Sequence, residues 1–108
     1  MINLMNWNVE NICGYKPKTT FYLEFSMADE TKDLNQIKKT FNKIFDLFKG
    51  YFDLLTELVM VLNWKIWEHY GDNESMARLY DELWRKTENY AYENLKGDEL
   101  NYFIRTID

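Results

Sequence analysis

The sequence predicts a single, mainly α domain, and three observations lead to that prediction. Only one proline and four glycines interrupt the 108 residues, so few positions break a helix. Over long stretches, apolar residues recur at alternating spacings of three and four, which is the period of an amphipathic helix. Aromatic residues make up 18% of the chain. At this length they can build one core but not two separate ones.

The longest row of apolar residues at helical spacing begins at Leu34. Its apolar positions are Leu34, Ile37, Phe41, Ile44, Phe48, Tyr51, Leu55, Leu58 and Leu62. Because the phase does not slip at Gly50, we expect one long central helix over residues 33–70, with a kink at Gly50. A glycine inside a helix costs about 1 kcal/mol relative to alanine. The alternative is a helical hairpin in which Gly50 ends the first helix.

A second apolar row follows the same segment. It consists of Met60, Trp64 and Trp67, at spacings of four and three. A helix that is apolar on two faces must be covered on both of them. We therefore expect this segment to lie at the centre of the domain.

Two further helices are expected, over residues 73–95 and 98–106. Gly71 and Gly97 suit helix ends, while Asp72 or Asn73, and later Asp98, suit the beginnings of the helices that follow. On the outer face of the first helix, an acid precedes a base by four residues, which stabilises a helix. These pairs are Glu74 with Arg78, Asp81 with Arg85, and Glu82 with Lys86.

The first 30 residues are expected to form a short N-terminal extended or hairpin segment. The stretch "FYLEFSM" places Phe21, Leu23, Phe25 and Met27 at every second position, which is typical of a half-buried strand. The alternative is a short helix that begins at Thr20 and uses the spacing of four between Phe21 and Phe25. Either form must lie against the helices, because an isolated hairpin is marginal in water.

The charge distribution favours a protein partner over nucleic acid. The net charge is −5, and residues 51–108 carry twelve acidic side chains against six basic ones. Direct binding of nucleic acid needs clustered positive charge, whereas an acidic surface suits a basic protein. Cys13 is the only cysteine, the start "MINLMNWNVE" does not resemble a secretory signal, and "LVMVLNW" is too short to span a membrane. We expect a cytoplasmic protein with no membrane association.

No pattern in the sequence indicates catalysis, a metal site or a cofactor. His69 is the only histidine, and Cys13 lies far from it in the chain. A zinc site usually needs several such ligands. Phosphate-binding loops and nucleophile motifs are also absent from the sequence. We therefore predict no enzyme, no metal and no cofactor, with His69 in a helix-capping or surface position.

Two sets of residues are candidates for binding a partner. Three acids of the second half precede a base by four residues, whereas six others lack an obvious local partner: Asp53, Glu57, Glu68, Asp72, Glu88 and Glu93. The first four of these six lie along the end of the expected long helix. They could meet a basic partner. Trp64 and Trp67 could instead form an aromatic patch that drives the formation of a symmetric homodimer. Most of the other rings fall at helical spacing with aliphatic residues, which favours a core over a nucleic-acid stacking platform.

Three stretches resemble a known family: "GYKPKTTFYLEFSMAD", "LTELVMVLNWKIWEHY" and "NYAYENLKGDELNYFIRTID". They are similar to small accessory proteins carried by phages and conjugative elements of Firmicutes. That family brings no known activity and no functional residues. The resemblance implies a mobile-element protein acting in a bacterial cytoplasm, where small acidic proteins often inhibit host defence, as anti-CRISPR proteins do. The expectation is a non-enzymatic acidic binding module that occupies a basic host surface; the alternative is a structural or regulatory homodimer of the mobile element.

Overall fold

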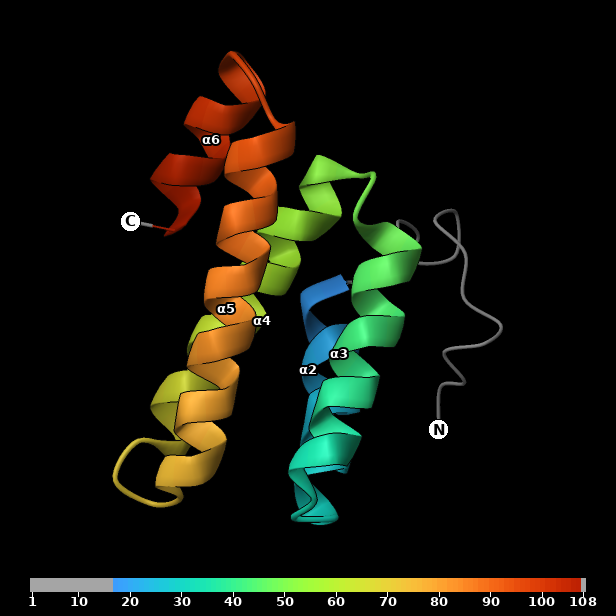
Figure 1. Ribbon diagram of the computed structural model, residues 1–108, viewed down its shortest axis with the longest axis vertical. Coiled ribbons are helices and arrows are strands. Elements are labelled where there is room, and N and C mark those ends of the chain that lie inside the picture. Colours follow the sequence, from blue (N-terminus) through green and yellow to red (C-terminus); the bar gives the residue numbers. More distant parts are fainter. Residues whose placement is uncertain (1–16, 108) are drawn as a thin grey trace.

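The computed structural model describes residues 17–107, and this part of the chain is all α. It contains α2 (Pro17–Glu30), α3 (Leu34–Phe48), α4 (Phe52–His69), α5 (Glu74–Asn94) and α6 (Asp98–Ile107) (Figure 1). The mainly α fold class is therefore confirmed. The prediction for Cys13 and the first part of the expected extended segment lie outside the described residues.

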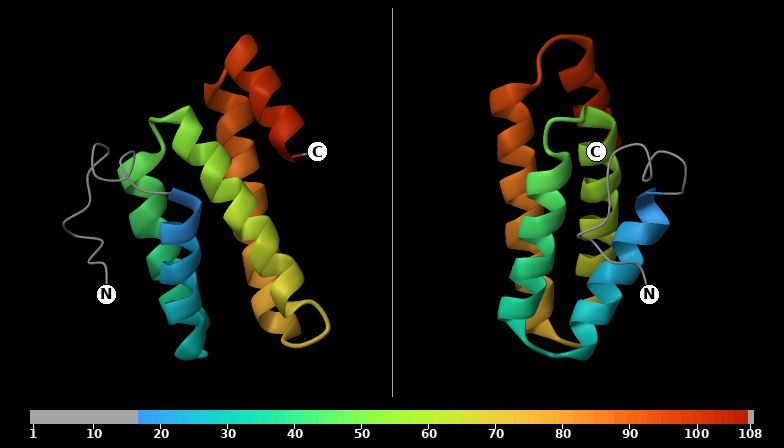
Figure 2. Two further views of the ribbon diagram at one scale, coloured as in Figure 1. Left: turned by 180° about the vertical axis from the view of Figure 1, so that it is seen from behind. Right: turned by 90° about the vertical axis from the view of Figure 1, so that its right-hand side faces the viewer.

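The helices form two layers. Figure 1 shows α3 and α5 in front of α2 and α4, and the view from behind in Figure 2 shows α2 and α4 in the near layer, running in the same direction. The contact between α4 and α5 is the most extensive, while α2 packs against both α3 and α4. The short α6 returns beside the beginning of α4. Thus α4 contacts every other helix of this part of the chain.

The expected long helix over residues 33–70 is wrong, because the chain turns back at Gly50. Helix α3 ends at Phe48 and α4 begins at Phe52, with Tyr51 in an extended conformation between them. A continuous helix of that length would measure about 57 Å, whereas the longest dimension of the domain is 38 Å. Folding back lets both halves bury their apolar faces in one core. The helical hairpin alternative is therefore what the protein adopts.

The expected strand around residues 20–28 is also wrong, because this stretch belongs to α2. Pro17 begins the helix, and a proline in the first turn loses no intrahelical hydrogen bond. Phe21, Phe25 and Ala28 are buried at spacings of four and three, while Leu23 is 51% exposed. The alternation of every second residue was therefore misleading. Helical spacing alone separates the buried positions from the exposed one.

The core lies between the two layers and is rich in rings. The phenylalanines of α3 point inward together with the aliphatic residues of α4. Phe41 stacks on Phe45 with ring centroids 5.3 Å apart, and Phe25 of α2 meets Tyr80 of α5 edge to face at 5.6 Å. Tyr80 and Phe25 are fully buried. The ring of Tyr80 thus packs α5 against α2, and the hydroxyl of the same side chain is buried there.

Local signals at the beginning of α5 agree with the sequence, whereas Asp98, expected to cap the last helix, lies in the first turn of α6. The Asn73 side chain accepts a hydrogen bond from the backbone N–H of Met76 and begins α5. Gly71 and Gly97 have φ angles of 80° and 63°, which a glycine adopts at little cost. The turn at Gly71 follows the end of α4, and the candidate site lies on the last turns of that helix.

Candidate functional site

A buried lysine is the centre of a polar network between α2 and α4. The Lys65 side chain is only 1% exposed. Its ammonium group donates to Ser26 Oγ at 2.7 Å, to Asp29 Oδ2 at 2.7 Å and to Glu68 Oε2 at 2.6 Å. An ammonium has three protons, so each of them has an acceptor. Such complete pairing is what allows a charge to be buried.

Asp29 extends the network to α5. Its Oδ2 atom accepts from Lys65 and lies 2.9 Å from His69 Nε2. Its Oδ1 atom accepts a hydrogen bond of 2.6 Å from the Tyr80 hydroxyl. One carboxylate therefore connects α2 with α4 and α5.

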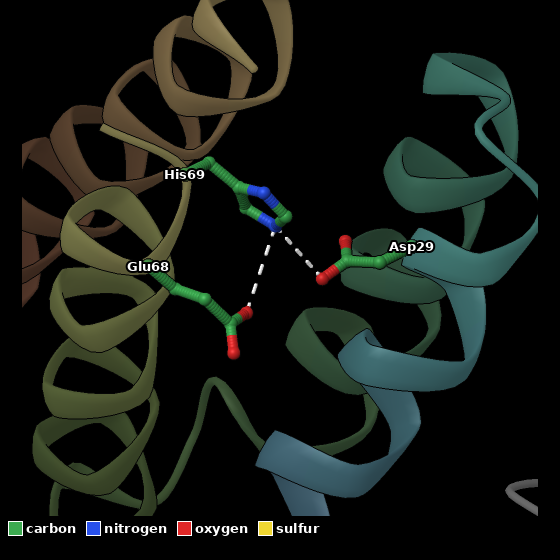
Figure 3. Close-up of side chains that lie close together, drawn as sticks. All are labelled: Asp29, Glu68 and His69. Carbon is green, nitrogen blue, oxygen red and sulfur yellow. Dashed lines mark hydrogen bonds and ion pairs between the residues drawn. The ribbon is translucent and has the colours of Figure 1, made fainter. Parts of the chain in front are cut away.

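The imidazole of His69 is held in place on two sides. Its ring is parallel to that of Tyr80, with an interplanar angle of 1° and centroids 5.8 Å apart. Figure 3 shows Nε2 facing both acids, 2.9 Å from Asp29 Oδ2 and 3.6 Å from Glu68 Oε2. His69 lies in the last turn of α4, where the sequence placed it, but it is buried, so the expected surface position is wrong. Burial, together with the hydrogen bond to Asp29, raises the pKa of the Tyr80 hydroxyl, which stays a donor.

Glu68 connects the network to the outside. Its Oε2 atom accepts from Lys65, and its Oε1 atom accepts from the Tyr22 hydroxyl. Burial alone would raise the pKa of Glu68, but the hydrogen bonds from Lys65 and Tyr22 outweigh it and lower that pKa. The hydrogen bond between Tyr22 and Glu68, together with partial burial, raises the pKa of the Tyr22 hydroxyl. Glu68 is therefore held as a carboxylate.

Asp29, Glu68 and His69 form a donor set of the kind that binds a divalent cation. Their ligand atoms lie within 4.8 Å of one another, and carboxylate oxygens and imidazole are common metal ligands. However, Asp29 Oδ2 and Glu68 Oε2 are the two oxygens that the Lys65 ammonium contacts. A metal ion would have to displace that ammonium. Lys65 is thus the cation that this cluster already holds.

We expect the stability of the protein to depend on pH through the carboxylate of Glu68. Because its pKa is lowered by folding, Glu68 contributes stability above its unfolded pKa of about 4.3. That contribution is lost as the pH falls through the lower, folded value. We expect Glu68→Gln to have a lower melting temperature than the wild type at pH 7, with the difference disappearing near pH 2.

Melting curves of both proteins across this pH range measure the effect. Asp72→Asn is the matched control, because Asp72 is an exposed acid in the turn after α4. A Glu68→Gln deficit that stays the same at every pH would contradict this role of the carboxylate.

The outer face of α4 carries a row of residues that are exposed, apart from the half-buried Glu57 and Met60. We define the α4 stripe as this row together with Tyr70, which directly follows the helix: Asp53, Glu57, Met60, Trp64, Trp67 and Tyr70. Trp64, Trp67 and Tyr70 are 44%, 67% and 68% exposed. The row Met60–Trp64–Trp67 was expected to be covered because α4 is central. That expectation is wrong for Trp67, which the other described helices leave open, whereas Met60 is half-buried and Trp64 lies against Tyr22 of α2.

The buried network and the α4 stripe lie on neighbouring faces of the same turns of α4, and Tyr22 of α2 contacts both. The ring of Tyr22 meets Trp64 edge to face, with centroids 6.3 Å apart. The Lys65 ammonium lies 4.4 Å from the centre of that Tyr22 ring. Farther along the stripe, the rings of Trp67 and Tyr70 lie side by side, with centroids 5.6 Å apart. The charged groups inside therefore help to fix the positions of the rings outside.

The predicted partner-binding residues are only partly brought together. Asp53, Glu57, Trp64 and Trp67 all lie on the α4 stripe. The Glu57 Oε2 atom is 3.7 Å from Lys18 Nζ but is buried and has no hydrogen-bond partner. Asp72 is exposed in the following turn.

Glu68 does not join the other acids, because it is engaged with Lys65 and Tyr22. The expected four-acid surface is therefore not one surface. Four of the six candidates nevertheless share one side of α4.

Lys65 and Asp29 were not among the residues that the sequence indicated as candidates. One signal was present: Lys65 and His69 continue the buried spacing of Leu55, Leu58 and Leu62 at intervals of three and four. A lysine in such a position requires buried acids. Which acid would meet it was not readable, since Asp29 lies 36 residues earlier.

A hollow of about 670 Å³ lies between α3 and α5. Two of the basic side chains that line it have partners: Arg85 donates to Asp81 at 3.0 Å, and Lys86 lies over the ring of Phe41 at 5.6 Å. The Arg85–Asp81 bond also raises the pKa of Arg85. This agrees with the solvated helix face expected for α5.

The fold and the site define a class: a small all-α domain with a buried ionic network beneath an exposed aromatic helix face. Comparisons with protein-family models, with curated proteins and with solved structures found no match. The resemblance to accessory proteins of mobile elements thus stays a prediction. Within residues 17–107, no helix combines the length and the apolar character that crossing a membrane requires.

Proposed function

We propose that the protein is a non-enzymatic protein-binding module whose contact surface is the α4 stripe. One observation carries the proposal: two tryptophans lie exposed on the outer side of a helix whose inner side is the core. Tryptophan and tyrosine dominate the binding energy of protein interfaces, and a grouped apolar patch on a small domain marks an interaction site. The network beneath holds part of this patch in place before binding, which reduces the ordering cost.

The partner in this proposal is a basic protein. The net charge of −5 and the acids at the beginning of the stripe favour a positive surface, and they disfavour a nucleic-acid backbone. The resemblance adds the setting of a bacterial cytoplasm and a mobile element. In that setting, the module acts as an anti-CRISPR-like inhibitor by occupying the basic surface of a host-defence nucleoprotein.

A second candidate is a structural or regulatory homodimer. The exposure of Trp67 and Tyr70 favours it, since 67% and 68% of these side chains remain open to solvent. A two-fold axis through the stripe would cover them with the same residues of another copy. Sensitivity to salt separates the two candidates, because contacts between charges weaken with ionic strength and apolar contacts do not.

The test uses Trp67→Ala, with Tyr92→Ala as the matched control. Both rings are exposed, but Tyr92 lies on α5, away from the stripe. The tagged full chain is used to capture proteins from a bacterial lysate at low and high salt, and its mass is measured by light scattering. We expect Trp67→Ala to lose the captured protein while Tyr92→Ala retains it, with both variants melting like the wild type.

A salt-resistant dimer that Trp67→Ala dissociates would replace the proposal with the homodimer. Equal capture by Trp67→Ala and the wild type would contradict the stripe as the contact surface in either form.

A further inference from the structure

We infer that the α4 stripe receives a basic amphipathic helix of another protein, with the positive residues of that helix over Asp53 and Glu57 and its apolar residues over Met60, Trp64 and Trp67. The inference rests on the proposed function and names the chemistry of the partner.

The shape of the stripe favours a helix as the occupant. From Asp53 to Trp67 its residues follow at spacings of four, three, four and three, so they form one row along α4 of about 21 Å. Such a row fits the groove between the side-chain rows of a second helix. One way in which an extended peptide binds is by adding a strand to a sheet edge, and residues 17–107 offer no sheet for that.

The charge of the stripe is uneven along its length. The acids Asp53 and Glu57 lie at its beginning, and the aromatic residues lie toward its end. The Glu57 Oε2 atom has no hydrogen-bond partner, and its ion pair with Lys18 is long at 3.7 Å. Because that atom is buried beside Lys18, the carboxylate at this end that is open to a lysine or arginine of a partner helix is that of the exposed Asp53. The polarity of the stripe therefore sets the direction in which the partner helix lies.

A second copy of this chain does not supply that charge. It would bring its own Asp53 and Glu57, and acids placed opposite acids repel. Lys65, on the same helix, is buried and has all three protons engaged. Asp72 adds negative charge at the other end, so neither direction of a copy meets a basic patch on the stripe. The geometry thus favours a different, basic protein.

The experiment is a selection of helical peptides on the immobilised full chain. An 18-residue display library keeps leucines at positions i, i+3, i+7 and i+10 and varies the remaining positions among Lys, Arg, Glu, Asp, Gln and Ser. We expect the enriched peptides to carry Lys or Arg at one end. Their affinity should fall at least about tenfold for Asp53→Lys/Glu57→Lys and should weaken with salt.

The matched control for charge is Glu82→Lys/Glu93→Lys, which makes the same change in net charge on exposed acids of α5. It should leave the peptide affinity within about twofold of the wild type. Peptides selected on Asp53→Lys/Glu57→Lys should be acidic at the corresponding end. Such a reversal would not occur if any acidic surface sufficed.

The outcomes separate this inference from the proposed function. Enriched peptides without basic residues, an affinity that Asp53→Lys/Glu57→Lys does not change, or no enrichment would overturn the inference. The proposed function would still stand if Trp67→Ala loses the protein partner captured from lysate. Peptides that bind Trp67→Ala as well as the wild type would contradict both.

Discussion

Replacing Lys65 with methionine should lower the free energy of unfolding by about 3–5 kcal/mol, the usual cost of removing one member of a buried ion pair. The methionine keeps most of the volume of the lysine but donates no hydrogen bonds. Asp29 and Glu68 would then lose the charge that lies 2.7 Å and 2.6 Å from their oxygens. Chemical denaturation monitored by circular dichroism measures the loss.

Lys39→Met is the matched control, because Lys39 is exposed on α3 and should cost less than about 0.5 kcal/mol. Adding Asp29→Asn to Lys65→Met should restore part of the lost stability, since fewer uncompensated charges remain buried. A Lys65→Met protein as stable as the Lys39→Met control would show that the ammonium is not buried among these acids.

Replacing Phe25 with alanine should cost about 3–5 kcal/mol, the range for a phenylalanine removed from a core. Phe25 is fully buried and lies against Tyr80, so its loss leaves a cavity between α2 and α5. Leu23→Ala, two residues away and half exposed, should cost less than about 1 kcal/mol. Urea unfolding of both variants measures the difference.

The pair also tests the helix against the strand. If residues 20–28 were a strand, Leu23 and Phe25 would face the same side and both changes would be costly. Two similar losses would therefore contradict α2 as a helix.

The sequence predicted those parts of the fold that depend on local pattern. The end of α4 and the beginning of α5 follow from Gly71 and Asn73, which act on neighbouring backbone groups. The break at Gly50 could not be read in the same way, because the apolar phase happens to continue through it. What decides the break is the compactness of the whole domain, which a window of residues does not contain. Likewise, the sequence of residues 20–28 fits two patterns. Phe21 and Phe25 are four residues apart, as in a helix, and apolar residues recur at every second position, as in a strand.

The candidate site was predictable on its exposed side and hidden on its buried side. Trp64 and Trp67 stood out because their row differs from the core row of α4. The expectation that this row would be covered failed, because coverage depends on where the other helices lie. The network was not predicted because its partners come from three helices. Lys65, Asp29 and Tyr80 are distant in sequence and meet only in the folded domain.

Because α2 and α4 run parallel, the polar contacts between them fix the position of one helix along the other. Lys18 lies beside Glu57, Ser26 beside Lys65, and Asp29 beside both Lys65 and His69. Apolar contacts are non-directional and tolerate a sliding of one helix along another. A shift of α2 by one turn, about 5.4 Å, would instead break all of these hydrogen bonds and ion pairs at once. The register of α2 along α4 is therefore set by hydrogen bonds with defined geometry. Through Tyr22, the same register sets the height at which α2 meets the outward-facing indole of Trp64.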